Sequence, residues 1–155
     1  MTIEQVKAYL SECGLGGRVQ EFDVSSATVE LAAQALGCEP CLIAKTMSFL
    51  VDGHVALVVL AGDARIDNAK FKACFHQKAK MLTHEQVSEM TGFPVGGVCP
   101  FLAPEGTRVY LDESLKRFEI VYPAAGSPSS AVKVNLQELE SASKAEAWID
   151  VSKLS

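Results

Sequence analysis

Residues 41–50 combine a strand-like apolar pattern with one charged residue. Side chains of a β-strand point to alternate faces, and one face here carries Ile43, Lys45, Met47 and Phe49. Three of these four side chains are apolar and should be buried, whereas the fourth ends in an ammonium group. Desolvating that charge is costly. Lys45 therefore either extends to water from the start of the strand or lines a pocket that binds an anionic or carbonyl group.

A second apolar run follows at Val55–Leu60, after the tetrapeptide Val51-Asp52-Gly53-His54. An Asp-Gly pair between two apolar runs is typical of a β-hairpin, because a type I′ turn needs positive φ at both central residues. The pattern predicts that Ile43–Leu50 and Val55–Leu60 are adjacent and antiparallel.

Helices are predicted where an N-capping residue precedes apolar positions at helical spacing. The expected caps are Thr2, Thr28, Asp67, Thr83 and Asn135. Gly14, Gly37 and Gly92 mark three of the helix ends. The third helix should bury Phe71, Cys74 and Phe75. Further strands are expected over residues 18–23, 108–111, 119–124 and 131–134, and Trp148 should pack on the body of the protein. The alternation predicts a single mixed α/β domain over residues 1–155.

Residues 93–101 form an apolar segment that is rich in glycine and proline. Paired glycines allow backbone N–H groups to approach a ligand closely. The segment is therefore either a ligand-binding loop or a buried crossover loop.

Composition restricts the possible functions. The chain has 155 residues, of which 48% are hydrophobic, and a net charge of -5. This excludes general disorder and argues against a broad basic surface that grips nucleic acid. A small pocket that holds only the end of a nucleic acid remains compatible. We expect a cytoplasmic protein, because the N-terminus has no signal-like pattern and no apolar run could span a bilayer.

The five cysteines indicate reduced thiols. Cys38 and Cys41 form a Cys-x-x-Cys pair, but a structural zinc site needs a second pair of ligands. A thioredoxin-like motif would follow a strand and open a helix, whereas this pair follows a predicted helix and opens a strand. We expect neither a metal nor a cofactor.

Several segments together resemble the YbaK family of editing domains, which is related to the insertion domain of bacterial prolyl-tRNA synthetase. They are the Ala-rich helix after Thr28, Gly37, residues 43–46, the Asp52-Gly53 hairpin, residues 95–101, residues 109–115 and Ala125-Gly126. The resemblance implies a curved, barrel-like β-sheet flanked by helices. It also implies a free-standing deacylase that hydrolyses mischarged aminoacyl-tRNA, typically tRNA-Pro carrying a small wrong amino acid such as cysteine or alanine. The implied partners are the acceptor end of the tRNA and prolyl-tRNA synthetase, with no membrane and no DNA.

The resemblance places Lys45 on the family's functional lysine and residues 96–101 on its glycine-proline loop. The predicted substrate-binding residues are Phe22, Thr46, Met47, Gly96, Gly97, Val98, Cys99, Pro100, Phe101 and Gly126. Cys99 stands where many relatives have serine or threonine. The late loop lacks the histidine of the alanyl-tRNA-specific branch.

The expected chemistry is attack on an aminoacyl ester without a Ser-His-Asp triad, since none is visible. Backbone N–H groups of residues 96–98 can stabilise the oxyanion. Lys45 can hold the terminal phosphate or the carbonyl oxygen. Cys99 is expected to line the pocket rather than to attack, because no activating histidine is evident. A non-catalytic module that binds an amino acid or a tRNA end, and a redox protein using Cys38 and Cys41, are the alternatives.

Overall fold

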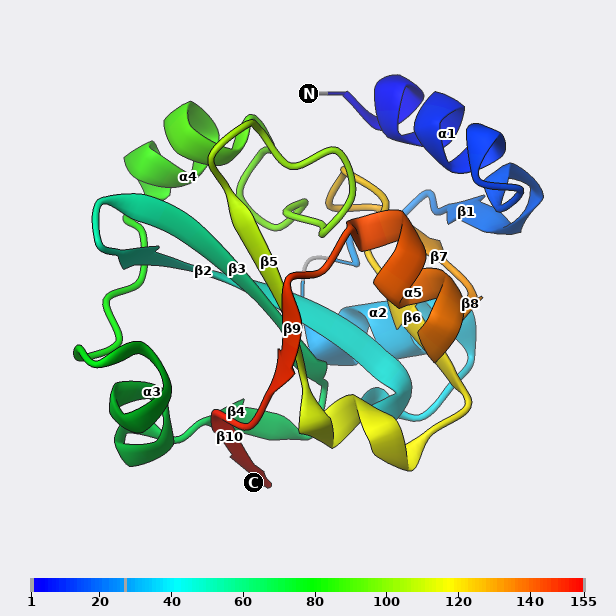
Figure 1. Ribbon diagram of the computed structural model, residues 1–155. Helices are drawn as coiled ribbons and strands as arrows, with labels where there is room; N and C mark the ends of the chain where they lie inside the picture. Colours follow the sequence, from blue (N-terminus) through cyan, green and yellow to red (C-terminus); the bar gives the residue numbers. More distant parts are fainter. Residues whose placement is uncertain (1, 27, 155) are drawn as a thin grey trace.

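The computed structural model describes residues 2–26 and 28–154. Within them the main sheet has six strands in the order β8-β6-β2-β3-β5-β9, as Figure 1 shows. These strands are β2 (Ile43–Val51), β3 (His54–Ala61), β5 (Arg108–Asp112), β6 (Ile120–Pro123), β8 (Val134–Asn135) and β9 (Ala147–Ile149). Two smaller sheets pair β1 (Val19–Glu21) with β7 (Ser130–Val132) and β4 (Ala64–Ile66) with β10 (Ser152–Leu154). The helices are α1 (Ile3–Glu12), α2 (Val29–Leu36), α3 (Asn68–Phe75), α4 (His84–Thr91) and α5 (Leu136–Ser143).

The β2–β3 hairpin is the centre of the sheet, and it confirms the predicted pairing. Its strands are antiparallel, with Val51 opposite His54 and Ala44 opposite Ala61. The two turn residues, Asp52 and Gly53, have φ values of 51° and 79°. These are the left-handed conformations that a type I′ turn requires.

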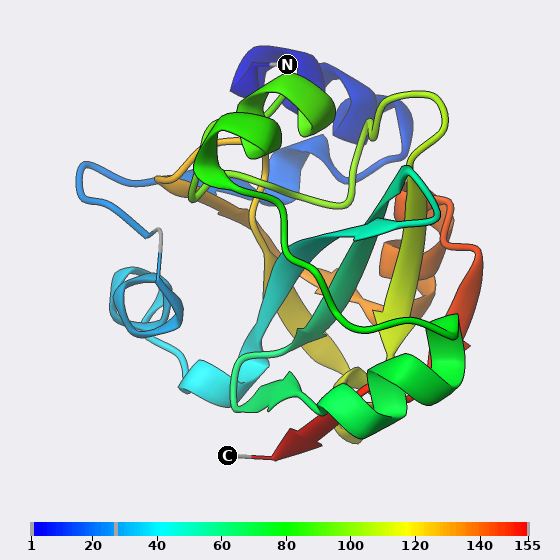
Figure 2. The same ribbon diagram turned by 90° about the vertical axis from the view of Figure 1, so that its left-hand side faces the viewer.

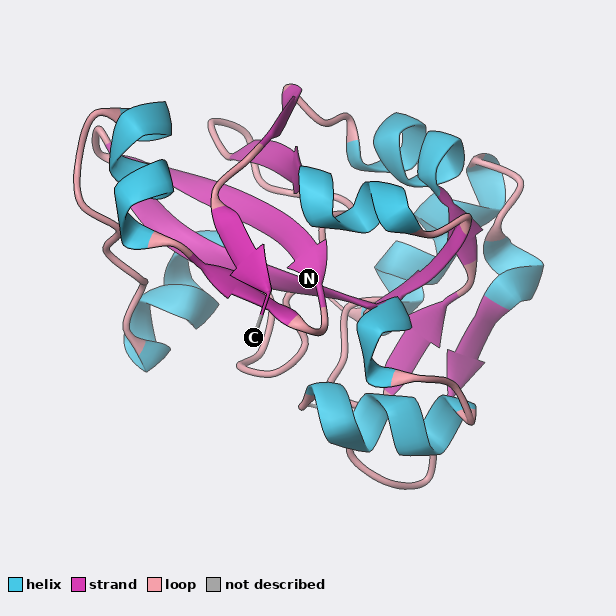
Figure 3. Ribbon diagram, turned by 90° about the horizontal axis from the view of Figure 1, so that it is seen from below, coloured by secondary structure: helices cyan, strands magenta, loops and turns pink. Residues whose placement is uncertain are grey.

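The strands beside the hairpin arrive from distant parts of the chain. β5 runs parallel to β3, and β9 runs parallel to β5. On the other side β6 is parallel to β2, but it pairs only with Ile43 and Ala44 at the start of that strand. The sheet is curled, as the view from below shows (Figure 3). The mixed α/β class with a curved sheet is therefore confirmed.

All five helices begin at the predicted caps. Thr2, Thr28, Asp67, Thr83 and Asn135 each accept a hydrogen bond from a backbone N–H of the first turn. Gly37 ends α2 and Gly92 ends α4, both in the left-handed conformation. Figure 2 shows α2 beside the lower part of the sheet. One prediction about the inner face of a helix is wrong. Cys74 of α3 is exposed, and Phe71 is the fully buried residue of this helix.

The core follows the hairpin and the strands and helices packed on it. Its largest fully buried side chains include Phe49, Phe71, Phe93 and Phe101. Phe49 stacks on Phe71 with ring centroids 4.9 Å apart. A smaller cluster joins Ala32 and Ala33 of α2 to Ile43. None of the described helices is long and apolar enough to cross a membrane.

Candidate functional site

A cavity of about 150 Å³ lies at the start of β2. Its walls come from the beginning of α2, the first residues of β2, the loop at residues 96–98, and the segment from β6 to β7. Many lining side chains are small, namely Ala32, Ala44, Ala124 and Ala131. The cavity brings together four of the predicted site residues: Lys45, Thr46, Gly96 and Val98.

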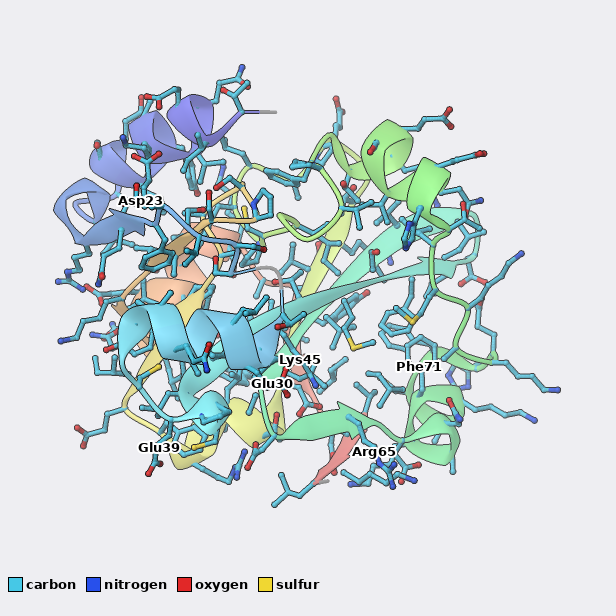
Figure 4. All side chains as sticks on the ribbon, turned by 180° about the vertical axis from the view of Figure 1, so that it is seen from behind. Asp23, Glu30, Glu39, Lys45, Arg65 and Phe71 are labelled. Atoms are coloured by element: carbon cyan, nitrogen blue, oxygen red, sulfur yellow. The ribbon has the colours of Figure 1, made fainter. Side chains whose placement is uncertain are left out.

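Lys45 is half-buried in this wall. No side chain among the described residues forms a hydrogen bond or an ion pair with its ammonium group. Burial lowers the pKa of Lys45 below its ordinary value of 10.5, while the charges of Asp63 and Glu30 act in the opposite direction. Figure 4 shows Lys45 beside Glu30 at the beginning of α2. A partly desolvated cation without a direct partner is suited to bind an anionic or carbonyl oxygen.

Asp63 follows β3 and is held in place by Arg117. The guanidinium donates to both carboxylate oxygens, with Nη1 3.0 Å from Oδ2. This contact lowers the pKa of the Asp63 carboxyl below its usual value. Asp63 therefore stays charged near neutral pH and contributes a fixed negative potential near Lys45.

Thr46 is the next residue of β2 and also lines the cavity. Its hydroxyl oxygen is buried, and it has no hydrogen-bond partner among the described residues. Buried hydroxyl groups in folded proteins nearly always have one. An unpaired polar group in a cavity wall is a candidate contact for a bound molecule.

The glycine-proline loop contributes two residues to the wall rather than six. Gly96 and Val98 line the cavity. Gly97 is buried against the late loop, where an added Cβ would come within 2.9 Å of the Ser127 backbone. The absence of a side chain thus allows two loops to pack backbone to backbone.

Cys99, Pro100 and Phe101 lie in the core instead of the cavity wall. The Cys99 thiol donates to the Phe101 carbonyl at 3.6 Å. Burial raises its pKa to about 12, so the thiol is neutral near pH 7 and is a poor nucleophile. The sequence could not show this burial, because an irregular loop lacks the alternating pattern of a strand that indicates which side chains face inward.

The three remaining predicted substrate-binding residues do not line the cavity. Phe22 is partly buried, and its N–H donates to the Ser129 carbonyl at 2.8 Å. Met47 packs against the core. Gly126 has a φ of 98°, and an added Cβ would come within 2.8 Å of Val6.

Sequence reasoning missed the polar wall formed by Ser26 and Ser130. The Ser130 side chain is held by the late loop, because the Ser127 hydroxyl donates to its oxygen at 2.9 Å. The only signal was a serine-rich turn before a predicted strand, which does not distinguish a pocket wall from a surface turn.

The Cys38 and Cys41 thiols have pKa values that burial raises. A redox motif of the thioredoxin type depends on a lowered thiol pKa. The structure therefore does not favour the redox alternative.

The family model for the aminoacyl-tRNA editing domain matches residues 23–142. The chain belongs to this family. The matched range contains every residue of the cavity wall.

Relatives extend this match to nearly the whole chain. The uncharacterized protein YwhH of Bacillus subtilis (strain 168) is 46% identical over 154 residues, which is 99% of this chain and 98% of that protein. A crystal structure described as a candidate trans-editing enzyme for prolyl-tRNA synthetase has a TM-score of 0.86 and 30% identity, and the match covers 97% of this chain and 96% of the other. The chain therefore has the same fold as that structure.

Proline–tRNA ligases share part of the domain. The ligase of Maridesulfovibrio salexigens is 34% identical over 92 residues, which span 57% of this chain and 15% of the ligase. The chain is therefore similar to a small part of a much longer synthetase.

Proposed function

We propose that this protein is a trans-editing deacylase that hydrolyses tRNA-Pro carrying a small wrong amino acid such as cysteine or alanine. The observation that carries the proposal is the half-buried Lys45 ammonium, which has no direct partner among the described residues and faces a small cavity. Membership of the aminoacyl-tRNA editing family supplies the substrate class.

The cavity walls suggest how the ester is cleaved. Water attacks the ester carbonyl, the bond to the ribose oxygen breaks, and the tRNA leaves with a free hydroxyl group. Lys45 holds the terminal phosphate or the carbonyl oxygen as a point charge. Backbone N–H groups of Gly96 and Val98, the two loop residues that line the cavity, stabilise the developing oxyanion, which commonly lowers such barriers by a few kcal/mol. The Gly97 N–H is already bonded to the Pro94 carbonyl at 2.9 Å.

No general base is evident from the described geometry. None of the three histidines, His54, His76 and His84, lines the cavity. Hydrolysis therefore depends on positioning and on groups of the substrate itself, such as its ribose hydroxyl.

The size of the cavity supports a small acyl group. A volume of about 150 Å³ lined by four alanines has room for a short acyl side chain. Discrimination between similar small side chains is weak, at about 1–3 kcal/mol per methylene. Prolyl-tRNA synthetase is a reasonable partner, because an acidic protein with a net charge of -5 has little long-range attraction for tRNA.

The test is deacylation of a panel of tRNA-Pro molecules carrying cysteine, alanine, proline or phenylalanine. We expect hydrolysis of the cysteinyl or alanyl ester and much slower hydrolysis of the prolyl and phenylalanyl esters. Binding of mischarged tRNA without turnover of any of them would favour the non-catalytic alternative.

A further inference from the structure

Alternate residues of β2 direct their backbone groups toward opposite edges of the strand. Val51 and His54 flank a two-residue turn and form a hydrogen-bonded pair, so the odd-numbered residues of β2 bond to β3. Ala44, Thr46, Ser48 and Leu50 therefore direct their N–H and C=O groups to the outer edge.

Both ends of this outer edge are covered. At one end Ala44 pairs with Pro123 of β6. At the other end the Leu50 N–H donates to the Lys80 carbonyl at 2.8 Å, and the Leu82 N–H donates to the Ser48 carbonyl at 3.1 Å. Thr46 lies between the two covered stretches.

The backbone groups of Thr46 have no partner on that edge. The pairing with β6 stops at Ala44, and across residues 2–26 and 28–154 no other backbone group bonds to the Thr46 N–H or C=O. The Thr46 hydroxyl oxygen is unpaired as well. One residue thus presents three free polar groups, and it lines the cavity next to Lys45.

The gap has the length of one amino acid rather than of a peptide strand. Three residues lie between Ala44 and Ser48, and the four steps from one to the other span about 13 Å along a strand. Neighbouring chain occupies both ends. An occupant must therefore carry one donor and one acceptor at the spacing of a single residue, as the α-amino group and the carbonyl group of an aminoacyl ester do.

We propose that the aminoacyl group of the substrate binds in this gap as a one-residue extension of the sheet. Its free α-ammonium donates to the Thr46 carbonyl, and its own carbonyl oxygen accepts from the Thr46 N–H. The Thr46 hydroxyl supplies a third contact within the cavity. This inference rests on the proposed function and adds to it a requirement for a free α-amino group.

The requirement is tested with two non-hydrolysable analogues, 3′-alanylamino-3′-deoxyadenosine and its propionyl counterpart. The propionyl compound lacks only the α-amino group. A hydrogen bond from a charged donor contributes enough that the alanyl compound should bind about 10- to 100-fold more tightly. In ¹⁵N–¹H NMR spectra of the full chain, the Thr46 amide should be among the most strongly shifted signals when the alanyl compound binds.

Two threonine variants separate the backbone contact from the hydroxyl. Thr46→Val keeps the backbone groups, so binding should weaken while the preference for the alanyl compound persists. Thr107→Val, remote from this cavity, should bind both analogues as the wild type does. Equal affinity of the wild type for the two analogues would overturn the inference, as would binding that leaves the Thr46 amide signal unmoved.

The binding readout is independent of turnover. Hydrolysis of mischarged tRNA together with equal affinities would refute this inference and leave the proposed function standing. A clear preference for the alanyl analogue without hydrolysis of any ester would refute the proposed function alone.

Discussion

Lys45 carries its charge on a strand face that is otherwise apolar. Its pKa lies below 10.5 because burial disfavours the charged form, although Asp63 and Glu30 reduce this effect. A lowered lysine pKa means that the charged form costs folding stability. This cost is fully present below the folded pKa, which includes neutral pH, and it is lost as the pH rises to the ordinary value of 10.5. The proposed role in substrate binding would account for a charge at this position in the cavity wall.

The activity of the wild type should decline at alkaline pH, because the ammonium is the form that binds oxygen. The decline should begin at a lower pH than the 10.5 of an ordinary lysine. The measurement is the pH profile of kcat/KM, with spontaneous ester hydrolysis subtracted at each pH.

The Asp63→Asn variant provides the control for this assignment. Removing the negative charge removes an influence that raises the Lys45 pKa, so the alkaline decline should move to still lower pH. Asp150→Asn, which affects only the ion pair with Lys70, should leave the profile in place. A profile that is the same in all three proteins would rule out Lys45 as the titrating group.

At the scale of elements, the site depends on two loops that pack through their backbones. Gly97 is buried, and an added Cβ would lie 2.9 Å from the Cα and carbonyl carbon of Ser127. Because both neighbours are backbone atoms, the clash cannot be relieved by rotating a side chain.

Gly97→Ala should therefore destabilise the protein by about 1–3 kcal/mol, the typical cost of overpacking, and should reduce deacylation as the loops separate. Gly17→Ala is the matched control, since an added Cβ there meets nothing within 4 Å. Urea unfolding and activity of the two variants are compared. Equal stability of Gly97→Ala and wild type would show that the loops are not held by this contact.

The sequence predicted those elements whose formation depends on residues close together in the chain. Caps such as Thr28 and the Asp52-Gly53 turn act through neighbouring residues, and all of them are confirmed. The short strands β4, β9 and β10 were missed, because three-residue strands are defined by partners far away in the chain. β9 is an example, since Trp148 pairs with Leu111 and its indole N–H donates to Glu140.

The cavity was predicted only in part for the same reason. Lys45 stood out because a charge interrupts an apolar face. Ser130 gave no such signal, because its place in the wall depends on the late loop folding over β7. The roles predicted for Phe22, Met47 and Gly126 remain predictions.

At the scale of the whole molecule, a net charge of -5 limits how the protein can hold tRNA. Affinity should come from the acceptor end in the cavity and from few phosphate contacts. Each neutralised phosphate adds roughly 0.7 to 0.9 to the slope of log affinity against log salt.

The affinity for mischarged tRNA should therefore depend weakly on salt, with a slope no steeper than about -3. An acceptor-stem minihelix should give the same slope as the full tRNA. Binding measured between low and physiological salt checks this expectation, and a slope near -6 would indicate a broad phosphate-binding surface instead.

The most direct test of the account is single-turnover deacylation of alanyl- and cysteinyl-tRNA-Pro by the wild type, Lys45→Ala and Lys45→Arg. Lys78→Ala, on an exposed residue, is the matched control, and circular dichroism verifies folding. Losing one preorganised charge contact should cut the rate of Lys45→Ala by about 100-fold or more. Lys45→Arg should also be impaired, because a planar guanidinium does not replace a compact ammonium. Near-wild-type rates for a folded Lys45→Ala protein would contradict the central claim that Lys45 holds the substrate.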